Sequence, residues 1–267
     1  MAVVTFLSAK GSPGVTTTAL LAAALWPRPA LLLEADPAGG DVAARLSAAD
    51  GAPLDTGRGL LPLLTAARRG LDAAAVLDQA QPVAGGSRVV LGLTGPQQAA
   101  AGGRGWAALT AAVEDLGAGP GQEGTDVLLD AGRVGAAPVH LDLLRASDRV
   151  VLLVRADAAA VLHARDRLRL LGTALRRRDG LLPRTGVVVV GDGAGRGRDA
   201  AGAVEVLRAA QPWVEDLGRL PHDRTGAAVF TGTPVARPER TALVRAGRVL
   251  VTALAGRAVH PAPRSAA

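Results

Sequence analysis

Residues 3 to 20 decide the fold, and they read Val-Val-Thr-Phe-Leu-Ser-Ala-Lys-Gly-Ser-Pro-Gly-Val-Thr-Thr-Thr-Ala-Leu. An apolar run leads into a glycine-containing turn, and a threonine cluster then opens an Ala/Leu-rich segment, which predicts a strand, a loop and a helix. Such a loop can bind phosphate, because Gly11 and Gly14 let backbone amides approach an anion and the helix N-terminus adds partial positive charge. A hydroxyl at the helix start, from Thr16 or Thr17, could hold a magnesium ion.

The usual phosphate-binding loop ends in Gly-Lys-Ser/Thr, and here Val15 occupies the lysine position. A lysine stands five residues earlier, at Lys10. The stretch from Lys10 to Thr17 resembles the deviant Walker A motif, Lys-Gly-Gly-x-Gly-Lys-Thr-Thr, of the ParA/MinD family of ATPases. In that family the early lysine reaches across a dimer to the partner's nucleotide, and the resemblance implies this catalytic role for Lys10. The implied nucleotide-binding residues of the loop are Lys10, Gly11, Ser12, Pro13, Gly14, Val15, Thr16 and Thr17.

Lys10 is the only lysine of the chain, since 29 of the 30 basic residues are arginine. The chain also lacks Ile, Asn and Tyr, whose codons are AT-rich like those of Lys, so we infer a high-GC genome that has drifted towards arginine. An ammonium and a guanidinium are poor substitutes at a crowded phosphate site, which favours a functional Lys10. The alternative is a lysine in a solvated turn.

A second acidic motif follows the next predicted strand, at residues 30–33, and reads Glu34-Ala-Asp-Pro-Ala-Gly-Gly-Asp41. It resembles the Asp-x-Asp-Pro-x-Gly stretch of the same family, whose second aspartate helps to bind magnesium and position the attacking water. Asp36 matches that position, so the resemblance implies a catalytic and metal-binding role for it. Glu34 replaces the first aspartate, and Gly40 stands where Asn is common. The alternative for Asp36 is a turn-forming Asp-Pro pair.

A third motif, Asp126-Val-Leu-Leu-Asp130-Ala-Gly-Arg133, is an apolar strand that closes on an aspartate and has the shape of a Walker B motif. Its carboxylate, with Thr16 and Asp36, would complete the oxygen-rich set that a magnesium–phosphate pair needs. The metal ligands expected are therefore Thr16, Asp36 and Asp130. Family members continue Asp-Thr-Pro-Pro, whereas here Arg133 offers either a replacement cation or an ordinary surface arginine.

The second half of the chain holds weaker signals. The predicted helix over residues 158–178 carries six arginines, which suit either non-specific binding to duplex DNA or a solvated helix face. Asp192, after the strand at residues 186–191, stands where family members commonly have an adenine-contacting Asn. Leu220-Pro221-His222-Asp223 resembles the family's Gly-x-Ile-Pro-x-Asp stretch near the base, so Pro221 and Asp223 are expected to bind nucleotide.

The whole pattern predicts an α/β fold, a P-loop NTPase-like three-layer sandwich whose mostly parallel sheet of about seven strands is flanked by helices. Residues 1–256 are expected to form one domain and residues 257–267 a disordered tail. That tail lacks the bulky apolar residues of an amphipathic helix, so no stable membrane anchor is expected. The N-terminus resembles no signal peptide and no apolar run reaches about 18 residues, which predicts a cytoplasmic protein.

With 267 residues and an apolar fraction of 49%, the chain can bury a large core, and the absence of cysteine excludes disulfides and thiolate sites. The formal charge of +6 permits weak association with nucleic acid without requiring it. The resemblance implies a protein that binds ATP and Mg²⁺ and forms a nucleotide-dependent homodimer, with DNA or another protein as further partner. Slow ATP hydrolysis is expected because Val15 lacks a charge; the alternatives are a pseudo-ATPase scaffold and, less well supported, a P-loop enzyme acting on a small metabolite.

Overall fold

The structure, a computed structural model, describes residues 1–116, 124–177, 179–191 and 197–256. Its eight strands form one sheet in the order β3-β4-β2-β5-β1-β6-β7-β8, and neighbouring strands are parallel except for the antiparallel pair β3 and β4. The strands are β1 Val3–Ser8, β2 Ala30–Glu34, β3 Gln81–Pro82, β4 Arg88–Val90, β5 Asp126–Arg133, β6 Arg149–Arg155, β7 Arg184–Gly191 and β8 Glu215–Pro221. The predicted parallel sheet is confirmed, and the strand that the sequence did not reveal is the two-residue β3.

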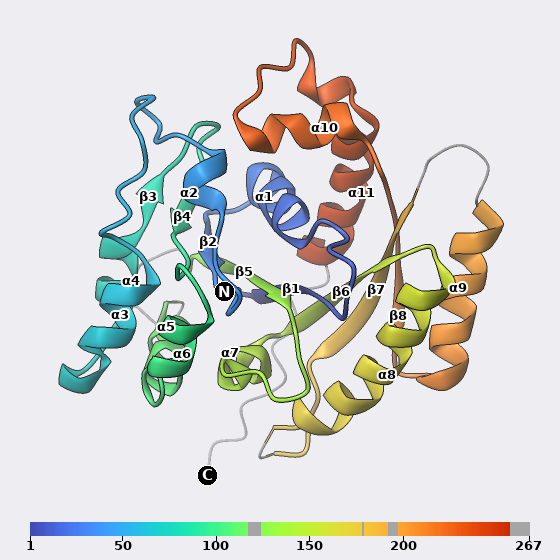
Figure 1. Ribbon diagram of the computed structural model, residues 1–267, viewed down its shortest axis with the longest axis horizontal. Helices are drawn as coiled ribbons and strands as arrows, with labels where there is room; N and C mark the ends of the chain where they lie inside the picture. The colour runs from blue at the N-terminus through green and yellow to red at the C-terminus, as the bar shows by residue number, and fades with distance from the viewer. Residues whose placement is uncertain (117–123, 178, 192–196, 257–267) are drawn as a thin grey trace.

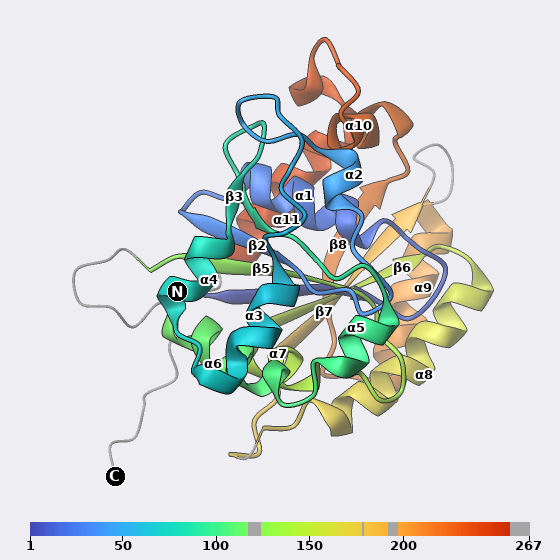
Figure 2. The ribbon, with the colours of Figure 1, turned by 60° about the vertical axis from the view of Figure 1, so that its left-hand side comes forward.

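Helices cover both faces of this sheet (Figures 1 and 2). They are α1 Val15–Leu25, α2 Val42–Arg45, α3 Leu60–Ala66, α4 Ala73–Gln79, α5 Pro96–Ala101, α6 Gly105–Asp115, α7 Leu141–Ala146, α8 Ala158–Ala174, α9 Gly197–Ala210, α10 Arg224–Ala228 and α11 Ala242–Gly256, with short 3₁₀ turns at Ala67–Arg69, Val229–Thr231 and Pro238–Arg240. Buried residues of α1 and α11 form the core on one face, and those of α3 to α9 form the core on the other. The predicted α/β sandwich of three layers is thus confirmed.

Side chains of the central strand β1 alternate between these two cores. Val4 and Phe6 pack with α1 and α11, whereas Val3 and Leu7 pack on the opposite side. Because successive residues of a strand point to opposite faces, a strand buried on both sides is apolar throughout, as the opening of the chain is. All six residues of β1 are buried, so the loop that follows it starts from a fixed point.

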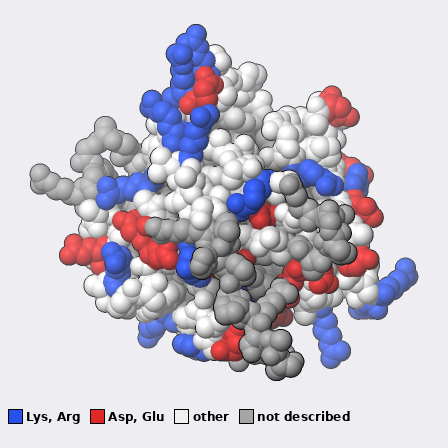
Figure 3. Space-filling view, turned by 180° about the vertical axis from the view of Figure 1, so that it is seen from behind, with Lys and Arg blue, Asp and Glu red and all other residues white. Residues whose placement is uncertain are grey.

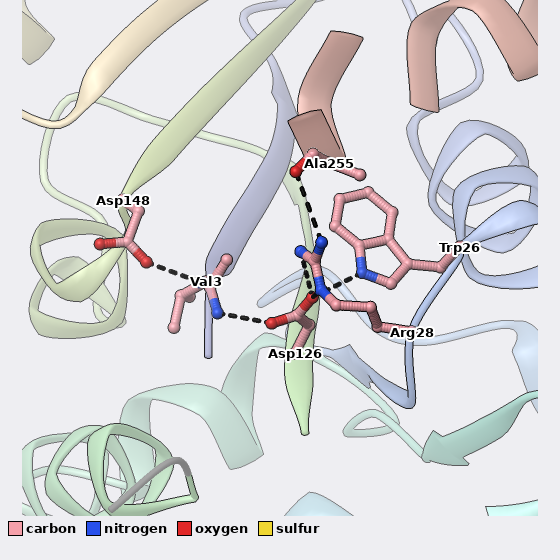
Figure 4. Close-up of polar contacts among 7 residues, drawn as sticks. Val3, Trp26, Arg28, Asp126, Asp148 and Ala255 are labelled. Carbon is pink, nitrogen blue, oxygen red and sulfur yellow. Dashed lines mark hydrogen bonds and ion pairs between the residues drawn. The ribbon is translucent and has the colours of Figure 1, made fainter. Parts of the chain in front are cut away.

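Asp126, at the start of β5, holds together the segments around the amino-terminal ends of the central strands (Figure 4). One carboxylate oxygen accepts a hydrogen bond of 2.6 Å from the Ala2 amide. The other accepts 2.8 Å bonds from Nε1 of Trp26 and Nε of Arg28, and it forms an ion pair of 2.6 Å with the same guanidinium. Arg28 also reaches the carbonyl of Ala255 at 3.5 Å, so this cluster joins β5, the N-terminus, the end of α1 and the end of α11.

Some expectations concern residues that lie outside the described part of the chain. The tail at 257–267 and the candidate Asp192 are both in this group. No helix within the described ranges is long and apolar enough to cross a membrane. The helix that was expected to extend to residue 178 ends at Ala174, and α7 and α10 are short helices that the sequence pattern did not indicate.

Candidate phosphate-binding site

The Gly-rich loop leaves the sheet at its topological switch point. β1 lies between β5 and β6, and the chain moves to one side for β2 but to the other side for β6, β7 and β8. In open parallel sheets, ligands bind outside the carboxyl ends of the strands at such a point. The sequence motifs around Lys10, Asp36 and Asp130 follow or end the neighbouring strands β1, β2 and β5, so they lie together at the carboxyl ends of these strands.

The loop backbone adopts a conformation that glycine favours. The φ angles of Gly11 and Gly14 are +86° and +90°, and Ser12 between them has a φ of +44°, the only positive value of a non-glycine residue in the described chain. Gly14 is the N-cap of α1, and no described side chain caps this helix. The first amides of α1 therefore remain available to an anion, which can also use the positive end of the helix dipole.

The side chains of Val15 and Lys10 lie in different environments, one buried and the other exposed. Val15, the first residue of α1, is 6% exposed and packs in the core, so its side chain brings no charge and no polar group to the loop. Lys10 is exposed, and its Nζ lies 3.3 Å from Nε2 of His163 on α8. Within its own chain Lys10 thus extends over α8 instead of folding back across the loop.

Asp130 is a buried carboxylate with an unsatisfied oxygen. Its Oδ1 accepts a 3.0 Å hydrogen bond from the Gly132 amide, whereas its Oδ2 has no hydrogen-bond partner in the described structure. Desolvation, aided by the charges of Glu34 and Asp36, raises the pKa of Asp130 to about 7, even though the nearby Thr16 hydroxyl and the Gly132 amide oppose the shift. A cation beside Oδ2 would remove the cost of this buried charge.

Asp36 lies across from Asp130, in the turn after β2. Its Oδ1 accepts a 2.8 Å hydrogen bond from the Ala38 amide, and burial raises the pKa of this carboxyl, partly offset by that bond and by Arg133. A Cβ on Gly132 would overlap the Asp36 carboxylate, and Gly132 has a φ of +57°. The departure from Asp-Thr-Pro-Pro at Gly132 therefore gives Asp36 its place next to the end of β5.

Glu34 has a structural role that the sequence did not reveal. It is 2% exposed and accepts hydrogen bonds of 2.7, 2.9 and 2.8 Å from the amides of Asp41, Val42 and Gly92. A Cβ on Gly40 would overlap its carboxylate. The two departures from the family motif thus compensate each other, because the longer Glu34 fills the space that a side chain at Gly40 would need.

A cleft of about 790 Å³ opens beside the loop, between the ends of β6, β7 and β8 and the helices α10 and α11. Ser12, Pro13, Gly14 and Thr17 line one side, and Pro221 and Asp223 line another, so the structure brings these predicted residues together. The Asp223 carboxylate accepts 3.0 Å bonds from the amides of Gly226 and Leu243, which hold its pKa below the ordinary value. Asp223 therefore shapes the cleft by joining α10 to α11.

Arginines surround the loop on several sides. Arg155, at the end of β6, and Arg224, on α10, line the cleft, and Nη1 of Arg45 lies 3.4 Å from the Thr17 hydroxyl. Arg133, which the sequence suggested as a replacement cation, lies near Asp36 and does not line the cleft. The sequence pattern gave no reason to select Arg155, because it ends an ordinary buried strand.

Two of the arginines that follow α8 donate hydrogen bonds to backbone carbonyls. Arg177 donates to the carbonyls of Arg145 and Ser147, and Arg176 donates to that of Gly180 at 2.9 Å. Arg165 forms an ion pair with its neighbour Asp166. Figure 3 instead shows Lys and Arg side chains gathered at the top of the molecule, the end at which Figure 1 places α10 and the turn before α11.

The oxygens at this edge fit a magnesium ion that is bound together with phosphate. Within the described residues no three His, Cys, Asp or Glu side chains are arranged to hold a metal by themselves. Mg²⁺ needs no such cage, since it is typically bound by one or two carboxylates, waters and the oxygens of a phosphate ligand. The bare Oδ2 of Asp130, the nearby Thr16 hydroxyl and the half-buried Asp36 match that requirement.

Comparison with solved structures identifies the fold. A ParA family ATPase from Chlorobium tepidum TLS superposes with a TM-score of 0.71 at 14% identity, over 94% of this chain and 98% of that one. Apo McdA from Cyanothece gives 0.70 at 16% identity, over 95% and 99%. The chain has the ParA/MinD fold. MinD from Pyrococcus horikoshii OT3, solved with Mg-ADP, gives 0.65 at 16% identity, over 95% of both chains.

No protein-family model matches the sequence, and neither does any curated protein. The ParA/MinD fold is therefore shown by the structure alone. Because one fold can carry different activities, the function is argued from the residues of the site.

Proposed function

We propose that the chain binds ATP and Mg²⁺ in this cleft and works as a nucleotide-dependent switch that dimerises in its ATP-bound form. Proteins of this fold include a ParA family ATPase, and MinD from Aquifex aeolicus has been solved in complex with MinC. The matching role here is the positioning of a chromosome, a plasmid, a division site or a pilus or secretion assembly. The chain would act in the cytoplasm. Its cargo would be a partner protein, or DNA that it binds without sequence specificity.

The observation that carries this proposal is the unsatisfied Oδ2 of Asp130. A buried carboxylate without a partner is costly, and proteins retain such a group where a ligand or ion uses it. The Asp130 carboxyl group lies close to Thr16, the second residue of the helix that starts at the Gly-rich loop. A magnesium ion held by Thr16, Asp130 and Asp36 would contribute charge for ATP phosphates that the loop amides bind.

Lys10 supports the dimeric part of the proposal. Its side chain is exposed and extends toward the exposed His163 on α8, so it can meet an anion on a second copy of the chain. The role that the family resemblance implies for this lysine, contact with the partner's nucleotide, needs that outward direction. In the dimer Lys10 and Asp36 would act together, the lysine on the phosphates and the carboxylate on the attacking water.

Hydrolysis should be slow and should depend on dimerisation. The loss of a cation from the terminal phosphates at Val15 is expected to cost about 2 to 4 kcal/mol in binding or barrier, roughly 30- to 1,000-fold. A partner's Lys10 could offset part of that loss. A monomeric variant that hydrolyses ATP as fast as the parent would contradict this expectation.

Isothermal titration with MgATP tests nucleotide binding directly. We expect saturable binding by the wild type, and weaker binding when EDTA removes magnesium or when Asp130→Ala removes the buried carboxylate. The wild-type titration alone decides the point: no heat of binding at millimolar MgATP would refute the proposal.

Size-exclusion chromatography with light scattering tests the switch. We expect the wild type to shift from monomer to dimer when ATP and Mg²⁺ are added, and Lys10→Ala to remain monomeric under the same conditions. Arg184→Ala serves as the matched control, because it removes one positive charge at the start of β7, at the end of the strand away from the loop. This variant should dimerise like the wild type. A Lys10→Ala protein that dimerises fully with ATP would remove the proposed role of this lysine.

A pseudo-ATPase scaffold is the second candidate, and the burial of Val15 in the core favours it. A scaffold would keep the sheet and the cleft but no turnover. The two candidates separate on one result, because a scaffold dimerises or binds its partner equally well with and without ATP.

A further inference from the structure

Val15 leaves the phosphate-binding loop without its usual cation, and the structure supplies another one. We propose that Arg155, at the end of β6, provides the positive charge that binds the nucleotide phosphates in place of the lysine missing at position 15. This inference rests on the proposed nucleotide binding and adds to it the residue that compensates for the altered loop.

The position of Arg155 follows from strand pairing. β6 runs parallel to β1 with Ser8 opposite Leu153, so the residue two places beyond Leu153 comes level with the start of the Gly-rich loop. Arg155 occupies that place. Its Cδ lies 3.6 Å from the point that a Cβ on Gly11 would occupy, so its side chain runs directly along the loop backbone.

Arg155 also borders the space that a nucleotide would fill. It lines the same cleft as Ser12, Gly14 and Thr17 of the loop and the first turn of α1. Among the described residues that line this cleft, the other arginine is Arg224, which belongs to α10 on the far side, next to Asp223. Arg155 is therefore the arginine of the cleft that adjoins the loop.

The guanidinium is available to bind phosphate. Its Nε lies 3.4 Å from Oδ2 of Asp157 in an ion pair whose partners are 54% and 50% exposed. Exposed pairs of this kind contribute little, because water competes for both charges. A polyphosphate offers more charge and a bidentate set of oxygens, for which guanidinium is the preferred partner, so the arginine can exchange Asp157 for the ligand.

Asp157 gives the proposal a test of opposite sign. Its Oδ1 caps α8 by accepting a 2.8 Å hydrogen bond from the Ala160 amide, while Oδ2 faces Arg155. Asn is as good an N-cap as Asp, so Asp157→Asn keeps the helix start and removes the charge that competes with phosphate. Because Asp157 itself lines the cleft, tighter binding by this variant supports the role of Arg155 only together with weaker binding by Arg155→Ala.

The experiment is a calorimetric titration of MgATP into the wild type, Arg155→Ala, Asp157→Asn and the control Arg184→Ala, with circular dichroism to verify that each is folded. Loss of a charged hydrogen bond to phosphate should weaken binding at least about tenfold in Arg155→Ala, and Asp157→Asn should tighten it about two- to fivefold. Arg184→Ala should stay within about twofold of the wild type. If the wild type binds and Arg155→Ala matches Arg184→Ala, this inference is overturned while nucleotide binding stands; if the wild type does not bind, the proposed function itself fails.

Discussion

Two aspartates on one strand, Asp126 and Asp130, show how the amino-terminal and carboxyl ends of the strands differ. Both belong to β5, both are 1% exposed, and three residues separate them. Asp126 accepts hydrogen bonds from the Ala2 amide and from Trp26 and Arg28, with an ion pair to the guanidinium. Asp130 accepts one amide bond and keeps an oxygen with no partner in the described structure.

Under the proposed function, this difference separates the ends of the strands that serve stability from the ends that serve a ligand. A buried carboxylate that is fully paired fixes its neighbours, and removing it leaves their donors unsatisfied. A buried carboxylate that is half paired costs stability in the free protein and is useful only when an ion or ligand completes it. The amino-terminal ends of the strands therefore hold the fold together, and under the proposed function the polar groups at the carboxyl ends serve binding.

The largest expected effect comes from breaking the paired edge. Asp126→Ala would leave the Ala2 amide and the Trp26 indole without an acceptor and the Arg28 guanidinium without its counter-charge. We expect the free energy of unfolding to fall by about 3 to 5 kcal/mol, as for the loss of one partner from a buried network. Urea denaturation followed by circular dichroism measures this fall, and a loss below 1 kcal/mol would show that water replaces the carboxylate.

The second prediction concerns pH at the unpaired edge. The pKa of Asp130 is about 7 in the folded chain and near 3.8 when unfolded, so between these values the folded state holds a proton that the unfolded state has released. Stability should therefore fall as pH rises from about 4 to 7, by about 4 kcal/mol at most for this group. Urea denaturation of Asp130→Asn and the wild type at pH 5 and pH 8 tests this, because the variant should lack that part of the loss.

Magnesium and nucleotide supply the matching control for Asp130. Added MgATP should stabilise the wild type more at pH 8 than at pH 5, because the ion binds the ionised carboxylate. An equal gain at both values would separate Asp130 from the metal site and leave the pH effect purely structural.

A smaller effect is expected from His140, which lies behind the same end of β5. This residue is fully buried against Trp106, at 5.8 Å between ring centroids, and neither ring nitrogen has a hydrogen-bond partner among the described residues. Desolvation lowers its pKa from 6.5 to about 4, with the Ala131 backbone opposing the shift. The unfolded chain therefore takes up a proton that the folded chain refuses, and stability falls as pH drops from 6.5 to 4, by about 3 kcal/mol at most.

His140→Phe keeps an aromatic ring at this position and removes the titration. Its stability should fall less than that of the wild type between pH 6.5 and pH 4, measured by urea denaturation at both values. Identical pH profiles for the two proteins would show that His140 can be protonated without unfolding, for example by turning toward solvent.

The sequence alone was enough to predict the fold, because apolar strand segments alternate with helical segments and three motifs follow or end those strands. Six of the seven longer strands contain an apolar run, because strands of a parallel sheet that is covered on both faces bury the side chains on both sides. The outer strand β8 is the exception, since only Leu217 and Leu220 of its residues are buried. β3 could not be predicted in this way, since two residues carry no period and one of them is Pro82. The short α7 and α10 are fixed mainly by packing and by the Asp223 cap, which leaves little trace in a hydrophobic pattern.

The candidate site was predictable where a motif has fixed spacing and not where it depends on neighbours in space. Asp36 and Asp130 were found because each follows or ends an apolar strand. The roles of Glu34 and Gly40 could not be predicted from the sequence. They depend on the Glu34 carboxylate lying across the following turn, where it accepts a bond from the Asp41 amide and occupies the space beside Gly40. Arg155 was missed for the same reason, because its closeness to Gly11 exists only once β6 is paired with β1.

The smallest effect is expected in the loop, where Ser12 tests how much strain the binding edge retains. A serine with a φ of +44° occupies the left-handed region that glycine adopts without cost, and such a residue persists only when its surroundings impose it. Ser12→Gly should raise the free energy of unfolding by about 1 kcal/mol, reduced somewhat by the greater freedom of glycine in the unfolded chain. Ser12→Ala is the matched control, since it removes the hydroxyl but keeps the strain, and it should not be stabilised. If both variants gain equally in urea denaturation, the hydroxyl and not the backbone is the unfavourable element, and the binding edge is less strained than its dihedral angle indicates.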